Sequence, residues 1–176
     1  VSWLNDIYKQ AKHNLLRARL MSAAEVNFIL AESAQRGWAA GSAETHYNNG
    51  LLEIKKNNYQ AAADLFTKCI SAKPNFDKAF SNRAVAFSNL KKYPEALQDI
   101  NKALLLNSTN AETYFNKALI FFGTNAKDSQ MVALNKCLEL KKDHSEALYY
   151  KGLLFYEDNN AAAAIDFYSK AIVINP

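Results

Sequence analysis

Three histidines and two cysteines are the side chains best suited to chemistry in this chain of 176 residues. A histidine can act as a general base or bind a metal ion, and a cysteine thiolate can attack as a nucleophile. His13, His46 and His144 lie far apart, and none belongs to a metal motif of the HExxH kind. Cys69 and Cys137 are also isolated, without the Cys-x-x-Cys spacing of a zinc or redox site. We therefore expect no catalytic residue and no metal site.

Acidic pairs and glycines add little to the case for catalysis. Glu157 with Asp158, and Asp143 with Glu146, fall at expected turns and helix starts, where carboxylates cap helices and remain solvated. The five glycines are isolated, so the chain has no GxxxxGK[ST] or GxGxxG phosphate-binding loop. These observations predict a protein that is not an enzyme and needs no cofactor.

A period of 34 residues organises the chain from residue 43 onwards. Small residues recur at the eighth and twentieth places, for example Gly50 and Ala62, and large apolar ones at the twenty-fourth, for example Phe66. Both cysteines stand at the twenty-seventh place, where we expect buried small apolar side chains too distant from each other for a disulfide. Each unit predicts two antiparallel helices, which must stack on their neighbours to bury their apolar faces. The aligned units are 43–76, 77–110, 111–144 and 145–176.

This pattern resembles the tetratricopeptide repeat family over residues 43–176. The resemblance implies an all-α, right-handed superhelical solenoid of four helix pairs, with a concave groove that binds a peptide or a segment of a partner protein. The third repeat departs from the family pattern, because Lys127 and Gln130 replace an aromatic and a small residue. Gln130 should push its two helices apart, so we expect the hairpin around 123–130 to be the loosest in the array.

The resemblance also assigns the concave wall to places 2, 5, 6, 9, 12 and 13 of each first helix. Asparagine stands at the sixth place in three repeats, and its amide can both donate to and accept from a peptide backbone. Aromatic residues accompany these amides, as suits a recognition surface. The alternative is that asparagine is simply frequent and that the aromatics pack between helices. The expected groove residues are Tyr47, Asn48, Lys78, Asn82, Phe115, Asn116, Leu119, Phe122, Tyr149, Tyr150 and Tyr156.

One specificity known within the family can be compared with this sequence. Chaperone adaptors clamp a C-terminal carboxylate with two lysines, two asparagines and an arginine, and residues 80–97 resemble one of their repeats. Asn82 matches a clamp asparagine, whereas Tyr47, Leu51, Glu112 and Asn116 stand at the other four positions. A carboxylate would meet no compensating cations there, so we do not expect capture of an acidic tail.

Residues 1–42 lack the 34-residue pattern. Apolar residues at helical spacing predict one amphipathic helix over 2–21. Ser22 and Glu25 form a capping box for a second helix, which should end near Gly37. We expect these two helices to cap or extend the repeat array.

The stretch 20–50 resembles a helical hairpin of SusD-like glycan-binding outer-membrane lipoproteins. Arginine usage changes nearby, with Arg17, Arg19 and Arg36 before residue 43 and only Arg83 after it. Two interpretations stay open: a fusion of two ancestries, natural or engineered, with a seam near 42–50, and ordinary drift in a capping segment. No glycan-binding residue is carried over from that family.

Composition agrees with a helical array and excludes several classes of protein. Only 5 glycines and 3 prolines, with 49% apolar residues, fit poorly with collagen, disorder or a turn-rich β-sandwich. No apolar run reaches the roughly 18 residues that span a bilayer. The net charge of +4 is spread along the chain, which argues against nucleic acid as a partner.

The sequence as a whole predicts a non-enzymatic scaffold for an unidentified peptide or protein partner. The alternatives are an accessory glycan or nutrient-uptake protein of the SusD-like type, and an engineered repeat chain without an evolved ligand. The scaffold interpretation implies a soluble cytoplasmic protein, and the uptake interpretation a periplasmic or outer-membrane one. Ile165, Tyr168 and Ile172 share one face of the last helix, so we also expect an open surface for a further helix or for self-association.

Overall fold

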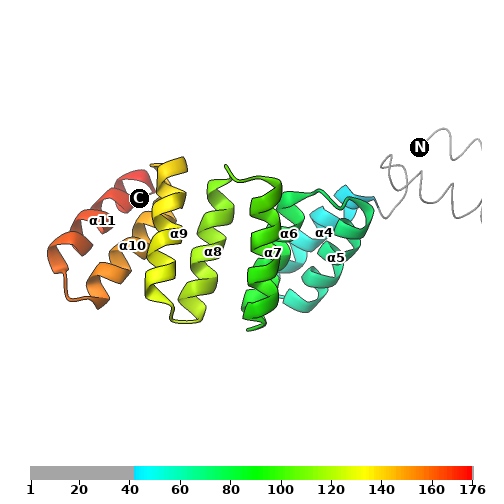
Figure 1. The fold of residues 1–176 in the computed structure, drawn as a ribbon, viewed down its shortest axis with the longest axis horizontal. Helices are drawn as coiled ribbons and strands as arrows, with labels where there is room; N and C mark the ends of the chain where they lie inside the picture. Colours follow the sequence, from blue (N-terminus) through cyan, green and yellow to red (C-terminus); the bar gives the residue numbers. More distant parts are fainter. Residues whose placement is uncertain (1–41, 176) are drawn as a thin grey trace, which may run out of the picture.

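The computed structural model describes residues 42–175, which form eight α-helices and no strand. Figure 1 shows an elongated array in which the helix pairs follow one another in sequence order, from α4 and α5 at one end to α10 and α11 at the other. The helices predicted over 2–21 and 22–37 lie outside the described residues. The bounds are α4 Ala43–Lys55, α5 Tyr59–Ala72, α6 Asp77–Asn89, α7 Tyr93–Leu106, α8 Ala111–Gly123, α9 Lys127–Leu140, α10 Ser145–Glu157 and α11 Ala161–Ile174.

Each 34-residue unit forms one helix pair, as the sequence predicts. The turn between the two helices also has the same backbone conformation in every unit. The fifteenth residue of every unit has a positive φ, between 56° and 60°. Asparagine tolerates this left-handed conformation better than most residues, and it stands there in three of the four units. The four residues are Asn57, Lys91, Asn125 and Asn159.

The small residues at the eighth place let the two helices of a pair approach closely. Ala118 is fully buried, and the two glycines at this place lie against aromatic rings of the partner helix. A Cβ atom added to Gly50 would come within 2.7 Å of the Phe66 ring, and one added to Gly152 within 2.9 Å of the Tyr168 ring. The close packing predicted for these positions is confirmed.

The third pair corrects one expectation. Gln130 is only 2% exposed, and Ala118 and Leu134 in the same interface are fully buried. Helices α8 and α9 pack against each other as extensively as the helices of the other pairs. The expectation that Gln130 pushes them apart is wrong, because an unbranched side chain can lie along the interface instead of separating it. The greater looseness of this hairpin stays a prediction.

Cys69 and Cys137 are free thiols buried in the core. Burial raises the pKa of the Cys69 thiol, which keeps it protonated and unreactive. Their interpretation as small apolar core residues is confirmed. Within residues 42–175, no three His, Cys, Asp or Glu side chains are arranged to hold a metal ion, and no helix is long and apolar enough to cross a membrane.

Candidate peptide-binding groove

The expected groove residues lie on the first helices of the four pairs, α4, α6, α8 and α10. Helix α6 contacts both α4 and α8, and the Tyr150 ring of α10 packs edge-on against Phe115 and Phe122 of α8. These four helices therefore form a continuous surface, which we call the groove face. Its exposed members are Asn48, Lys78, Phe122, Tyr149 and Tyr156, its half-buried members are Tyr47, Asn82, Leu119 and Tyr150, and its buried members are Phe115 and Asn116. The structure therefore offers a ligand only part of the predicted set.

The asparagines at the sixth place join neighbouring repeats to each other. Asn82 donates its amide Nδ2 to the Tyr47 hydroxyl at 2.9 Å, and Asn116 donates its Nδ2 to the Ser81 hydroxyl at 3.0 Å. In both cases the acceptor is the fifth-place residue of the preceding repeat. Their amide donors are used within the array, which favours the structural interpretation of these asparagines. Their role in ligand binding stays a prediction.

A second row of hydrogen bonds between repeats was not foreseen. The cation at the seventh place of repeats two, three and four donates to a polar side chain at the twenty-fifth place of the preceding repeat. The recurrence of arginine or lysine at the seventh place was a signal that could have indicated it. Together with the asparagine row, these bonds hold each first helix to the repeat before it. The pairs are Arg83 with Thr67 at 2.9 Å, Lys117 with Asn101 at 3.1 Å and Lys151 with Asn135 at 2.7 Å.

Arg83 also forms a largely buried ion pair inside the second repeat. Its Nε and Nη2 atoms donate to the two carboxylate oxygens of Asp99 at 2.7 and 2.8 Å. The Arg83 and Asp99 side chains are 17% and 7% exposed, and the rings of Phe80 and Phe87 flank the guanidinium. Such a bidentate pair satisfies both charges away from water.

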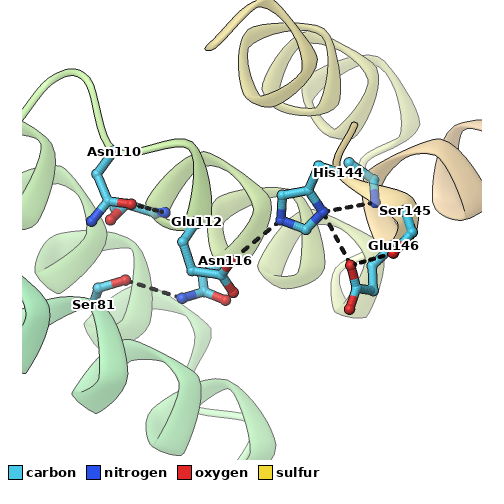
Figure 2. Close-up of polar contacts among 9 residues, drawn as sticks. Ser81, Asn110, Glu112, Asn116, His144, Ser145 and Glu146 are labelled. Carbon is cyan, nitrogen blue, oxygen red and sulfur yellow. Dashed lines mark hydrogen bonds and ion pairs between the residues drawn. The ribbon is translucent and has the colours of Figure 1, made fainter. Parts of the chain in front are cut away.

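His144 caps α10 at the junction of the third and fourth repeats (Figure 2). Its ring centroid lies 4.7 Å from that of Phe115, its Nε2 lies 3.2 Å from a Glu112 oxygen, and its Nδ1 accepts the Ala147 N–H at 3.3 Å. The Cys137 side chain and the Glu112 carboxylate raise the pKa of His144 above its usual value. When the ring is charged, Nδ1 becomes a donor, and a Glu146 oxygen 3.3 Å away can accept it. Sequence analysis missed this junction because its residues come from three helices.

The aromatic residues of the groove face gather in its last two repeats. The Tyr150 ring lies 5.8 Å from Phe115 and 5.4 Å from Phe122, both edge-on, and 5.6 Å from Tyr149. Burial raises the pKa of the Tyr150 phenol, so it stays neutral. Around this cluster, Phe122, Tyr149 and Tyr156 are 45%, 50% and 65% exposed. This is the part of the groove face best suited to contact a ligand.

A pocket of about 480 Å³ opens between α10 and α11 beside this aromatic cluster. Two larger depressions, of about 650 and 600 Å³, lie within the third and second pairs and contain none of the expected groove residues. On α11, Ile165 and Ile172 are exposed as expected, whereas the Tyr168 ring is half-buried against Gly152. Self-association through this face stays a prediction. The pocket of about 480 Å³ between α10 and α11 is lined by Ser145, Glu146, Tyr149, Tyr150, Tyr168, Ala171, Ile172 and Asn175.

Similar proteins of known sequence match this chain over part of their length. It is 31% identical over 77 residues to the DnaJ homolog subfamily C member 7 homolog of Dictyostelium discoideum, covering 42% of this chain and 14% of that protein. It is 37% identical over 59 residues to the human small glutamine-rich tetratricopeptide repeat-containing protein beta, covering 34% of this chain and 19% of that one.

Solved structures share the fold at low sequence identity. TTC0263, a tetratricopeptide repeat protein of Thermus thermophilus, superposes with a TM-score of 0.69 at 13% identity, over 76% of this chain and 75% of that one. MamA of Desulfovibrio magneticus RS-1 gives 0.66 at 19% identity, over 96% and 93%. The first tetratricopeptide domain of Spaghetti (RPAP3), solved with the HSP90 peptide SRMEEVD, gives 0.57 at 25% identity, over 70% and 90%. These similarities confirm the all-α repeat fold.

Family models divide the chain into two overlapping parts. The SusD-like model, described as starch-binding and associating with the outer membrane, matches residues 2–92. Tetratricopeptide repeat models match residues 77–110, 111–144 and 133–176. The SusD-like match crosses 42–50 and overlaps the first repeat match, so these matches mark no break at the expected seam. The chain belongs to the SusD-like family through its first half and to the tetratricopeptide repeat family through residues 77–176.

Proposed function

We propose that this chain is a non-enzymatic scaffold that binds an extended segment of a partner protein on the groove face. The observation that carries the proposal is the set of exposed rings of Phe122, Tyr149 and Tyr156 on one surface. Exposed aromatic side chains are enriched at the centres of protein interfaces, where they remove apolar area from water on binding. The repeat fold supports the same conclusion, because stacked repeats create extended binding surfaces.

The chemistry of the groove face favours a partner other than an acidic tail. The domain of Spaghetti (RPAP3) was solved with the HSP90 peptide SRMEEVD, whose second half is rich in acidic residues. In this chain Glu112 stands where capture of an acidic tail needs a cation, and its side chain is 65% exposed. Like charges would repel an acidic ligand there. The proposed partner is therefore neutral or basic along α8 and α10.

Selection from a library of random peptides tests the proposal on the intact chain. Selected peptides should bind in calorimetric titration, and the double variant Phe122→Ala, Tyr156→Ala should weaken them by about tenfold or more, as expected for interface aromatics. Leu105→Ala with Val132→Ala is the matched control, because these exposed apolar residues lie off the groove face. Equal losses in both variants, or no selected peptide at all, would reject the groove.

The SusD-like match supports a second candidate, an accessory role in glycan uptake at the outer membrane. This candidate predicts that the chain binds starch, which the scaffold proposal does not require. Electrophoresis in gels containing amylopectin measures this directly. Retardation relative to a gel without the polysaccharide would favour glycan uptake, and unchanged mobility would favour the scaffold.

A further inference from the structure

The third helix pair carries a pocket of about 650 Å³ between α8 and α9. Its walls include the half-buried rings of Tyr114 and Phe121 and the small side chain of Ala133, and Lys117 and Lys136 also line it. Figure 1 shows the third pair between the second and the fourth, so both neighbouring repeats are in place around this pocket. We call it the ring pocket.

The repeat period shows what fills the equivalent space in the fourth pair. The twenty-third place is Ala133 in the third repeat and Phe167 in the fourth. The Phe167 ring is stacked on that of Phe155, with centroids 5.4 Å apart and 6° between the ring planes. The ammonium groups of Lys151 and Lys170 lie 4.8 and 5.3 Å from the centre of the same ring. A parallel ring and two cations therefore surround an aromatic side chain there.

The second pair fills this space with an ion pair. Asp99 stands at the twenty-third place and holds the Arg83 guanidinium, which lies 5.6 Å from the centre of the Phe87 ring. Phe87, Phe121 and Phe155 all occupy the eleventh place of their repeats. In both pairs that flank the third, the ring at the eleventh place therefore has a planar group close to it.

The third pair has the surroundings of Phe167 but a much smaller residue in its place. Its ring and its two lysines, Phe121, Lys117 and Lys136, stand 34 residues before the three side chains around Phe167. The Lys117 ammonium also makes the hydrogen bond of its equivalent, to the preceding repeat. Because the Ala133 side chain ends at Cβ, the volume that the ring takes in the fourth pair belongs to the ring pocket here.

We infer that the ring pocket binds an aromatic side chain of a partner protein, phenylalanine or tyrosine, stacked on Phe121 and facing the Lys117 ammonium. Aromatic rings attract each other in offset stacks, and the negative face of a ring attracts a cation. The charge of the two lysines therefore complements an aromatic ring, whereas an aliphatic side chain would gain from neither contact. This site is separate from the groove face and does not depend on the proposed function.

The edge of the ring pocket favours a side chain over a free small molecule. Asp128, Ser129 and Glu139 also line the pocket, and all three are exposed. Apolar side chains surrounded by solvated polar ones are typical of protein interfaces, where the polar rim contacts the backbone and neighbours of the inserted residue.

A pentapeptide with phenylalanine between two pairs of glycines tests the pocket on the intact chain. The matched control peptide carries cyclohexylalanine, which has nearly the same size but a saturated ring. We expect saturable shifts of the Tyr114 and Phe121 ring signals in NMR spectra with the phenylalanine peptide. The control peptide should bind about fivefold more weakly, because its ring neither stacks nor attracts a cation.

Variants separate the space from the stacking ring. Ala133→Phe should fill the pocket as Phe167 does in the fourth pair, and abolish binding while the melting temperature is kept or raised. Phe121→Leu should lower the affinity for the phenylalanine peptide to that for the control peptide. Phe155→Leu is the matched control variant and should bind as the unchanged chain does, because Phe167 already covers that ring.

Several results would overturn the inference. They are the absence of saturable shifts, equal binding of the two peptides, and full affinity in a folded Ala133→Phe variant. If that variant did not fold, an unchanged preference for the aromatic peptide in Phe121→Leu would decide against the pocket. Binding of phenol without binding of the pentapeptide would assign the pocket to a small molecule instead, and a dimer that Ala133→Phe dissociates in sedimentation runs would assign it to a second copy of the chain.

The same variant keeps this inference apart from the proposed function. Peptides selected on the groove face should bind Ala133→Phe as they bind the unchanged chain, because the ring pocket contains none of the expected groove residues. Loss of the pentapeptide alone would therefore confirm the ring pocket whether or not the groove binds a partner.

Discussion

The first two repeats and the last two share one framework but present different surfaces. In the first half, fifth-place side chains are used to join repeats, as in the hydrogen bond from Asn82 to Tyr47. In the second half, Tyr150 replaces asparagine and the contact becomes an edge-on packing against Phe115. The eighth, twentieth and twenty-seventh places are buried in all four repeats. The comparison teaches that one place of the repeat can join neighbouring repeats either by a hydrogen bond or by ring packing.

The largest expected effect concerns the buried ion pair, which the second repeat has and the third lacks. Asp99→Ala leaves the Arg83 guanidinium without its partner and should lower the free energy of unfolding by about 3–5 kcal/mol. In the third repeat Ala133 stands at the place of Asp99, so Lys117→Met loses only a hydrogen bond to Asn101 and should cost less than about 1 kcal/mol.

Urea unfolding followed by circular dichroism measures both changes. The double variant Arg83→Met, Asp99→Leu serves as the control, because removing both charges together should recover most of the loss. If Asp99→Ala lowered the free energy of unfolding as little as Lys117→Met, the ion pair of the second repeat would contribute no more than the single hydrogen bond of the third.

The next effect compares the glycines at the eighth place of the first and last repeats. Gly50→Ala places a methyl group 2.7 Å from the ring of Phe66, which is fully buried and has no room to move. We expect a loss of about 1–3 kcal/mol from this overpacking. Gly152→Ala places a methyl group 2.9 Å from the half-buried Tyr168 ring, which can shift outward, and 3.3 Å from the Ala164 carbonyl oxygen. The better helix propensity of alanine offsets the remaining strain.

Thermal unfolding of the two alanine variants, compared with the unchanged chain, measures this difference. Gly152→Ala should remain close to the unchanged chain in its melting temperature. Equal losses in both variants would mean that the last pair is packed as rigidly as the first.

A smaller effect is expected at the asparagines between repeats. Asn116→Ala leaves the buried Ser81 hydroxyl without its donor, and we expect a loss of about 0.5–1.5 kcal/mol in the free energy of unfolding. Asn82→Ala should cost less, because Asn82 and Tyr47 are only half-buried and water can replace the bond. The affinity for peptides selected on the groove face tests the predicted ligand contacts of both asparagines. A several-fold loss of affinity with unchanged stability would confirm these contacts, and unchanged affinity would reject them.

The smallest effect is a dependence on pH at the third junction. The Cys137 side chain and the Glu112 carboxylate raise the pKa of His144 from 6.5 to about 10, so the folded state favours the charged ring. This stabilisation is fully present below pH 6.5 and is lost as the pH rises through the folded value. His144→Phe introduces the ring that Phe76 supplies in the first repeat. This variant should be less stable than the unchanged chain below pH 6.5, and the difference should disappear as the pH rises through the folded pKa. Solvent screens the exposed Glu112, so the difference should be small.

Equilibrium unfolding at several pH values follows this difference. Glu112→Gln is the control, since it should reduce the pH dependence while leaving His144 and its Cys137 neighbour in place. A stability difference that grows with pH would contradict the charged state of His144.

Local sequence patterns determined the helix pairs. The 34-residue period located all eight described helices, and the small residues at the eighth and twentieth places indicated which surfaces meet. This succeeds because helix contacts within a pair depend on side-chain size at fixed spacing. The two N-terminal helices, the right-handed superhelix and the division at residue 42 stay predictions.

Only the tertiary structure decided which polar side chains hold the array together and which are exposed on the groove face. An asparagine on a first helix looks the same in the sequence whether its partner is a peptide or a hydroxyl 35 residues earlier, as for Asn116 and Ser81. The same holds for His144, whose contacts with Phe115 and Glu112 require three helices to be placed first. The sequence determined the spacing of these groups, but their partners depend on the distance and direction between repeats, which packing of the whole array sets.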